Sequence, residues 1–125
     1  MYPRVQIHLD KLRQNLAACA GLVRKVPGCT LMIVTKGVCA YPPVVRMIAE
    51  HPEVDFVADS RIQNLKTYAD QVRRNGKQTV LLRLSMHSEV NDVVQYADLS
   101  FQSELSTTRL LDEAAGRAGK RHNIL

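Results

Sequence analysis

The sequence predicts an α/β fold: a parallel (β/α)8 barrel of the TIM type, of which these 125 residues would form about the first half. Strand-like apolar runs begin near residues 31, 54, 79, 99 and 122, about 20–25 residues apart, and one helical pattern separates each pair. No G-x-G-x-x-G or P-loop pattern follows these runs, which disfavours nucleotide-binding open sheets. Because eight such units need about 200 residues or more, we expect residues 1–125 to be the N-terminal portion of a longer barrel that stops in its fifth strand.

The first elements follow from apolar spacing. Val5–Leu9 alternates apolar and polar residues, which predicts a short, half-buried strand, and Asp10 is a suitable N-cap for the helix after it. Helical spacing then continues from Leu12 to Val26, and Pro27 with Gly28 ends that helix. The run Leu31–Thr35 has four large apolar side chains without alternation, which predicts a strand that is covered on both faces.

The same two patterns alternate through the rest of the chain. Helical spacing and turn residues give the helices, and short apolar runs give the strands. The expected order is a helix from the paired prolines 42–43 to about 51, a strand at 54–58, a helix from 62 to the Asn-Gly turn at 75–76, a strand at 79–82, a short helix at 90–94, a strand at 99–101, a helix capped by Ser103 and running to 119, and the beginning of a strand at 123–125.

Composition and cysteine usage indicate a folded protein of the cytoplasm. The chain is 46% hydrophobic and 23% charged, and no apolar stretch approaches the roughly 18–20 residues of a membrane span. The N-terminus lacks the apolar segment of a signal peptide. The chain has an odd number of cysteines, Cys19, Cys29 and Cys39, and their spacing is not that of metal ligands. We therefore expect free thiols, no metal site and a reducing compartment.

The net charge of +5 raises the question of nucleic-acid binding. The basic residues cluster at the ends of predicted helices, where they complement the helix dipole. With two Phe and four Tyr, the chain has little material for stacking bases. We therefore expect neither a nucleic-acid partner nor a membrane partner. The clusters are Arg24-Lys25, Arg73-Arg74 with Lys77, and Arg117 with Lys120-Arg121.

Lys36 is the strongest candidate for chemistry. It ends the apolar run at 31–35, and parallel α/β proteins place their active sites at the carboxyl ends of strands. A lysine held against apolar walls loses proton affinity, and its neutral amine can attack an aldehyde to form a Schiff base. The alternative is a solvated surface lysine, which is the commonest environment of this residue.

Several segments resemble the fold-type III PLP enzymes of the alanine racemase family, and most closely the alanine/ornithine racemase branch. These segments are Ile7–Leu16, Val34–Lys36, Ala58–Leu65, Leu81–Leu84 and Tyr96–Leu105. The resemblance implies that Lys36 carries pyridoxal 5'-phosphate and that the whole protein is an isomerase that racemises alanine or an ornithine-like amino acid. Residues 1–125 alone are expected to be inactive, because the phosphate-binding loops and a second domain with a catalytic tyrosine would follow Leu125.

The resemblance also implies cofactor contacts. Cys39, Asp59 and Arg83 follow the first three strands of the predicted barrel and are the candidates beside Lys36. Each has a plainer alternative: a small buried thiol for Cys39, helix capping for Asp59 together with Ser60, and a structural ion pair for Arg83. His87 could shuttle protons, although a lone loop histidine is usually polar surface.

Two other functions remain open. A non-catalytic PLP-binding protein of cofactor homeostasis would share the barrel and the lysine without the second domain. A purely structural half-barrel would pair with another copy, because an open sheet edge and a bare apolar face favour either self-association or missing chain. A homodimer is expected.

Overall fold

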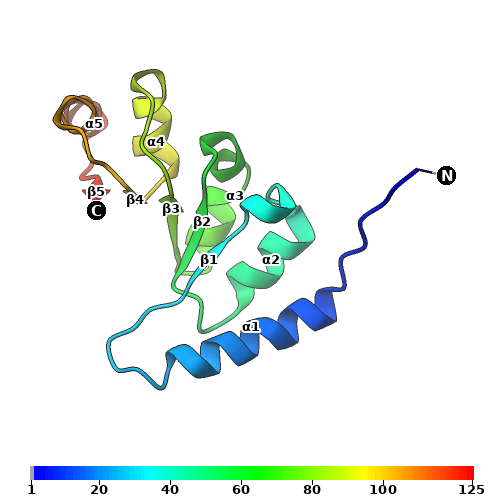
Figure 1. The fold of residues 1–125 in the computed structure, drawn as a ribbon. Helices are drawn as coiled ribbons and strands as arrows, with labels where there is room; N and C mark the ends of the chain where they lie inside the picture. Colours follow the sequence, from blue (N-terminus) through cyan, green and yellow to red (C-terminus); the bar gives the residue numbers. More distant parts are fainter. Residues whose placement is uncertain (1) are drawn as a thin grey trace.

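The computed structural model describes residues 2–125, in which five strands alternate with helices (Figure 1). The strands are β1 (Met32–Val34), β2 (Phe56–Asp59), β3 (Gln78–Leu81), β4 (Leu99–Ser100) and β5 (Asn123–Ile124). The helices are α1 (Leu9–Val23), α2 (Pro42–Glu50), α3 (Ile62–Arg74), α4 (Val90–Tyr96) and α5 (Leu105–Arg117), with 3-10 turns η1 (Lys36–Val38) and η2 (His87–Glu89). Across residues 2–125, no helix combines the length and the apolar character that crossing a membrane requires.

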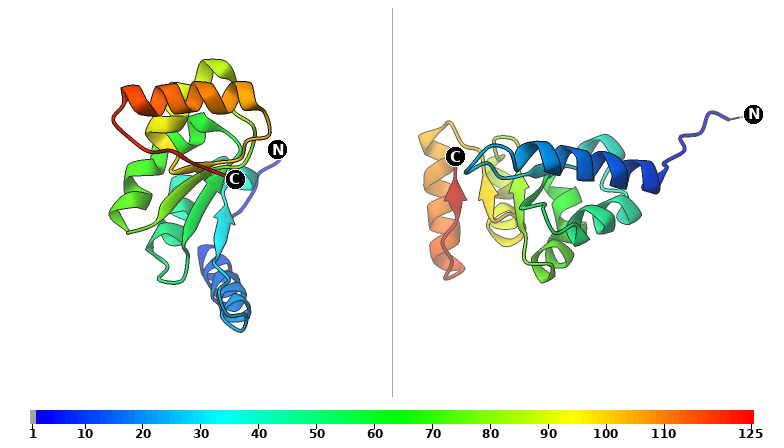
Figure 2. Two further views of the ribbon diagram at one scale, coloured as in Figure 1. Left: turned by 90° about the vertical axis from the view of Figure 1, so that its left-hand side faces the viewer. Right: turned by 90° about the horizontal axis from the view of Figure 1, so that it is seen from below.

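The strands form one parallel sheet in the order β1-β2-β3-β4-β5. A doubly wound sheet reverses its strand order at a switch point, whereas a barrel adds each new strand beside the last one. With right-handed crossovers, sequential order places the connecting helices on the same side of the sheet. Figures 1 and 2 show this layering, with β5 beside α5 at one margin of the molecule. The predicted parallel α/β class and the barrel-type order are confirmed.

The side of the sheet away from the helices is open at β1. Val57 is fully buried in the core between sheet and helices, so its strand neighbours Phe56 and Ala58 point to the other side. Val34 pairs with Ala58 in the sheet and is 41% exposed. The prediction that the first strand is covered on both faces is therefore wrong for residues 2–125, in which the helices cover one face.

The first predicted strand is absent from the structure. Residues 3–8 have no regular secondary structure, and α1 begins at Leu9 with His8 as its N-cap. Val5 is 89% exposed, since the segment lies beside no strand that could pair with it or cover its apolar side. Asp10 lies inside the first turn of α1, where its carboxylate accepts a hydrogen bond from Arg13 at 3.1 Å.

The other elements lie within a few residues of their predicted positions. The paired prolines open α2 at its first two positions, where their missing N–H groups cost nothing. Helix α3 ends at Arg74, just before the Asn75-Gly76 turn. Ser103 does not cap α5, whose N-cap is Glu104 without a side-chain hydrogen bond.

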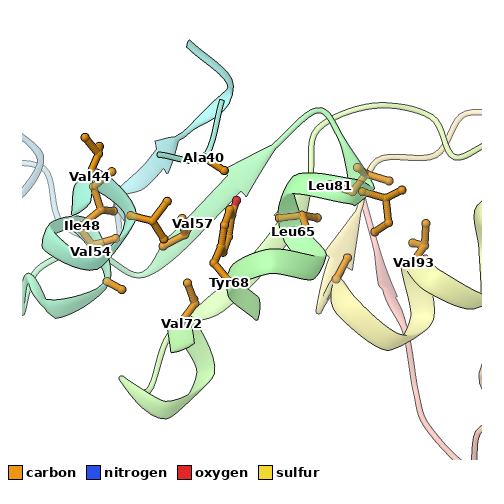
Figure 3. Packing of buried hydrophobic residues seen from close by; sticks show 14 of the residues in the cluster. Ala40, Val44, Ile48, Val54, Val57, Leu65, Tyr68, Val72, Leu81 and Val93 are labelled. Atoms are coloured by element: carbon orange, nitrogen blue, oxygen red, sulfur yellow. The ribbon is translucent and has the colours of Figure 1, made fainter. Parts of the chain in front are cut away.

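The core lies between the sheet and the helices (Figure 3). Helix α3 contributes most to its centre, because Ile62, Leu65 and Val72 recur at helical spacing and are fully buried. Val57 and Leu81 meet this face from β2 and β3. Helix α1 adds Leu16 and Ala20 to the same core. This packing fixes the carboxyl ends of β1, β2 and β3 relative to one another.

Candidate functional site

Lys36 lies at the carboxyl end of the sheet. It comes two residues after the end of β1 and opens the 3-10 turn η1. Its side chain is exposed and takes no part in the ion pairs found within residues 2–125. The expected apolar walls around this lysine are not formed by these residues, because the sheet has helices on its other side. The side-chain nitrogen is therefore accessible from solvent.

The turn after Lys36 has an unusual backbone. The N–H of Cys39 donates to the carbonyl of Lys36 at 3.2 Å, and the chain then passes through Cys39 and Ala40 at φ 48° and 55°. Left-handed backbone costs a residue with a Cβ atom about 1–2 kcal/mol. Strained conformations of this kind cluster at functional sites.

Cys39 itself is exposed. The interpretation of Cys39 as a small buried thiol is therefore wrong, since the left-handed turn leaves its side chain outside the core, whereas Ala40 beside it is buried. All three cysteines are free and exposed; their odd number and spacing predicted free thiols but not their exposure.

A buried polar network lies directly behind Lys36. The Thr35 hydroxyl oxygen lies 2.7 Å from Asp59 Oδ2, 3.0 Å from the Tyr68 hydroxyl and 3.2 Å from the carbonyl of Ala58. Thr35 and Asp59 have no exposed surface, and Tyr68 is 3% exposed. Burial raises the pKa of Tyr68, so its phenol keeps its proton and remains a donor. The network joins β1, β2 and α3.

Asp59 also holds the beginning of α3. Its Oδ1 accepts hydrogen bonds from the backbone N–H of Arg61 at 2.9 Å and from Asn64 Nδ2 at 3.1 Å. With Thr35 on Oδ2, both carboxylate oxygens are occupied. The N-cap of α3 is Arg61, which makes no side-chain cap hydrogen bond, so the prediction that Asp59 and Ser60 cap this helix is wrong in position. Ser60 contributes its backbone carbonyl, which accepts from Arg83 Nε at 2.7 Å.

Arg83 forms the predicted structural ion pair. Its Nη2 lies 2.8 Å from each carboxylate oxygen of Glu89, a buried residue. Its Nε and Nη1 donate to the carbonyls of Ser60 and Leu84. The guanidinium therefore ties the loop after β3 to the loop after β2. His87 is exposed in the neighbouring turn η2, and its role stays a prediction.

A second polar cluster at β4 and β5 is not evident from the sequence. Ser100 Oγ lies 2.8 Å from His122 Nε2 and 3.0 Å from Gln102 Nε2, which also donates to Ser85 at 2.8 Å. Burial lowers the pKa of His122, and the nearby charge of Asp98 opposes that shift. Parallel pairing of β4 with β5 brings these residues together across more than 20 positions of sequence.

The residues that sequence reasoning missed are mostly partners of those it found. Tyr68 lies on the buried face of α3, four residues before Val72, and a buried tyrosine hydroxyl usually needs a polar partner. That spacing could have pointed to a polar side chain on the neighbouring strand. No comparable sequence pattern points to the pairing of Glu89 with Arg83 across a loop.

The residues present fit a carbonyl cofactor bound through Lys36. Lys36 offers an unpaired, exposed amine at the end of a strand, which is the group an aldehyde needs. Both carboxylate oxygens of Asp59 and all three guanidinium nitrogens of Arg83 already form hydrogen bonds within the protein. No group of three or more His, Cys, Asp or Glu side chains that could hold a metal ion occurs within residues 2–125.

Comparison with known proteins gives a curated relative over the whole chain. Ornithine racemase of Acetoanaerobium sticklandii is 42% identical over 125 residues, which are 100% of this chain and 34% of that protein. The chain therefore spans about a third of the length of the curated relative it matches. No protein-family model matches the chain.

Solved structures share the fold at low sequence identity. An alanine racemase of Clostridium difficile 630 matches with a TM-score of 0.73 and 20% identity, over 93% of this chain and 30% of that one. PipY of Synechococcus elongatus PCC7942 matches with a TM-score of 0.70 without PLP and 0.67 with PLP bound, over 90% of this chain and 51% of that one. The sheet and helices correspond to the N-terminal part of an alanine racemase barrel. Together with the ornithine racemase relative, this confirms the resemblance to fold-type III PLP-dependent racemases.

Proposed function

We propose that residues 1–125 are the N-terminal portion of an alanine-racemase-like PLP-binding barrel, and that the whole protein racemises an amino acid. The observation that carries the proposal is Lys36: an exposed, unpaired lysine at the carboxyl end of β1, in a chain that aligns over its full length with an ornithine racemase. The open sheet edges at β1 and β5 agree with a larger barrel.

Lys36 would do two things. Its amine would hold the cofactor covalently at the aldehyde carbon. The Lys36 Nζ would also hold or move the proton at the substrate α-carbon. Pyridoxal phosphate, when bound, would supply an electron sink for that proton transfer. Cys39, Asp59 and Arg83 stay predictions as cofactor contacts.

The substrate proposed is a small amino acid, alanine or an ornithine-like one. The ornithine racemase relative favours ornithine among these. A homodimer stays a prediction for the whole protein, because a complete barrel would pair the edges of β1 and β5 that are open in residues 2–125.

The alternative is a non-catalytic PLP-binding protein of the same barrel fold. The favouring observation is the match to PipY, which was solved both without PLP and with PLP bound. That likeness extends over 51% of the PipY chain, compared with 30% of the alanine racemase. The two proposals share Lys36 and differ in whether the protein turns over a substrate.

Cofactor binding can be tested with absorbance and mass spectrometry. Pyridoxal phosphate is added to the protein and to its Lys36→Ala and Lys25→Ala variants, the second being a control at an exposed lysine. We expect the absorbance band of the covalently bound cofactor in the protein and in Lys25→Ala. Borohydride reduction should leave the added mass on the peptide that contains Lys36. Equal band formation in Lys36→Ala would contradict the proposal.

Turnover separates racemase from binder. The protein loaded with cofactor is incubated with L-alanine, L-ornithine, L-lysine and L-serine, and the D-enantiomer is measured by chiral chromatography. A D-product that disappears in Lys36→Ala supports the racemase. Cofactor binding without D-product from any of these substrates would support the alternative.

A further inference from the structure

The position that the Lys36 side chain can reach depends on the residue before it, Thr35. A lysine side chain has four flexible bonds, and the Lys36 ammonium has no ion-pair partner among residues 2–125. Its backbone anchor is therefore what limits where Nζ can go. That anchor is Thr35, which is fully buried while Lys36 is exposed.

Thr35 is held by both its backbone and its side chain. Its N–H donates to the carbonyl of Ala58 at 2.9 Å, and its carbonyl accepts from Val38 at 3.1 Å and from Ala40 at 3.3 Å. These bonds fix the start of the turn that carries Lys36. The side-chain hydroxyl adds contacts to Asp59 and Tyr68.

The proton directions in this network follow from its chemistry. The Thr35 hydroxyl has one hydrogen, and the carboxylate oxygen of Asp59 at 2.7 Å is its best acceptor. Tyr68 must then donate its own hydrogen to the Thr35 oxygen, 3.0 Å away. The raised pKa of Tyr68 agrees, because it keeps the phenol neutral. The network thus runs in one direction, from Tyr68 through Thr35 to Asp59.

The far end of the network is also fixed. Asp59 Oδ1 accepts from Arg61 and Asn64 at the beginning of α3, and Tyr68 belongs to the same helix. Helix α3 therefore contacts Thr35 twice, directly from Tyr68 and through Asp59. Because Ile62, Leu65 and Val72 of α3 are fully buried in the core, this places Thr35 on a rigid support.

We propose that Tyr68 and Asp59 are positioning residues that act through Thr35 to hold Lys36 in the geometry required to bind the cofactor. The proposal rests on the proposed function of Lys36. None of the three touches the reacting atoms in this assignment. Their effect is on the backbone that carries the amine, and misplacement of a reacting group by about 1 Å can lower the reaction rate by about a hundredfold, here the rate at which the amine and the cofactor aldehyde combine.

The chain contains a matched control for burial and chemistry. Thr79, on β3, is also fully buried, and its hydroxyl oxygen lies 2.9 Å from Asp98 Oδ2 and 2.8 Å from the carbonyl oxygen of Tyr96. It lies near the amino end of its strand, whereas Lys36 follows the carboxyl end of β1. Thr79→Val should therefore remove a comparable buried hydroxyl without affecting the lysine.

The test compares cofactor affinity with thermal stability in the whole protein. Pyridoxal phosphate is titrated by absorbance into Thr35→Val, Thr35→Ser, Tyr68→Phe and Thr79→Val, and each melting temperature is measured without cofactor. We expect Thr35→Val and Tyr68→Phe to weaken cofactor affinity about tenfold to a hundredfold. Thr35→Ser should restore most of the affinity, because serine keeps the hydroxyl. Thr79→Val should lower the melting temperature and leave the affinity unchanged.

The outcomes separate this proposal from the one it rests on. If Lys36→Ala still binds the cofactor covalently, the proposed function fails. If Lys36→Ala abolishes covalent binding while Thr35→Val and Tyr68→Phe bind like the unchanged protein, the positioning role alone is overturned. A loss of affinity in Thr79→Val equal to that in Thr35→Val would also overturn it, because destabilisation would then explain both. If Thr35→Val does not fold, Tyr68→Phe decides, since it removes a single oxygen.

Discussion

Arg83 Nη2 lies 2.8 Å from both carboxylate oxygens of Glu89, across the loop between β3 and η2. The carboxylate also accepts the backbone N–H of Met86 at 3.2 Å, so the pair closes the loop on itself. Glu89 is 7% exposed, and a buried carboxylate without a partner is costly. The pair therefore ties the chain that leaves β3 to the start of α4.

Removing one partner should cost more than removing both. We expect Arg83→Met to lower the free energy of unfolding by about 2–3 kcal/mol, because it leaves the Glu89 charge buried and unpaired. The double variant Arg83→Met/Glu89→Met should recover part of that loss. Urea unfolding followed by circular dichroism measures both. A double variant no more stable than Arg83→Met would contradict this account.

The left-handed turn after Lys36 should respond to glycine. Cys39 has φ 48°, so Cys39→Gly removes a Cβ atom from a backbone that disfavours it. We expect the free energy of unfolding to rise by about 0.5–1 kcal/mol. The same substitution at Cys19, an exposed position inside α1, should lower it by up to about 1 kcal/mol. Parallel thermal melts give both signs, and destabilisation by Cys39→Gly would show that the turn is not strained.

Much of the fold could be predicted from the sequence, because the spacing of apolar residues follows the local geometry of helices and strands. Ile62, Leu65 and Val72 predicted the buried face of α3, and the four-residue apolar run before Thr35 predicted β1. The strand predicted at Val5–Leu9 is absent, because an alternating pattern describes a single strand and not its neighbours. Whether a neighbouring strand exists to pair with it is not a local property.

The site was less predictable than the fold. The position of Lys36 followed from the end of the strand before it, as did those of Asp59 and Arg83. Their partners did not, because Thr35 reaches Tyr68 across 33 positions and Ser100 reaches His122 across 22. Such contacts depend on strand register and helix rotation, which the packing of the whole sheet determines.

Leu65 tests the assignment of α3 as the rigid centre of the core. It is fully buried, so Leu65→Ala should leave a cavity and lower the free energy of unfolding by about 2–5 kcal/mol. Leu105, which is 65% exposed at the start of α5, is the control, and Leu105→Ala should change stability by less than about 0.5 kcal/mol. Chemical denaturation of both variants checks this. Similar losses at the two sites would show that α3 is not the main core helix.

His122 should make stability depend on pH. Burial lowers its pKa in the folded chain below the ordinary value of 6.5, so the unfolded chain binds the proton more tightly. The contribution of neutral His122 is therefore fully present above about pH 6.5 and is lost as the pH falls through the lower, folded-state pKa. Protonation would also make Nε2 a donor, so the Ser100 hydroxyl oxygen would have to accept the hydrogen bond between them.

The measurement is urea unfolding at intervals from about pH 5 to 8, the range in which histidine titrates. We expect the free energy of unfolding to fall on acidification through this range, and the fall to be smaller in His122→Asn, which has no titrating ring. His87→Asn is the control, because His87 is exposed in η2 and should leave the pH profile unchanged. An identical pH profile in His122→Asn and the unchanged protein would mean that other groups cause the acid sensitivity. A fall that persists in His122→Asn but vanishes in His87→Asn would assign it to the exposed histidine instead.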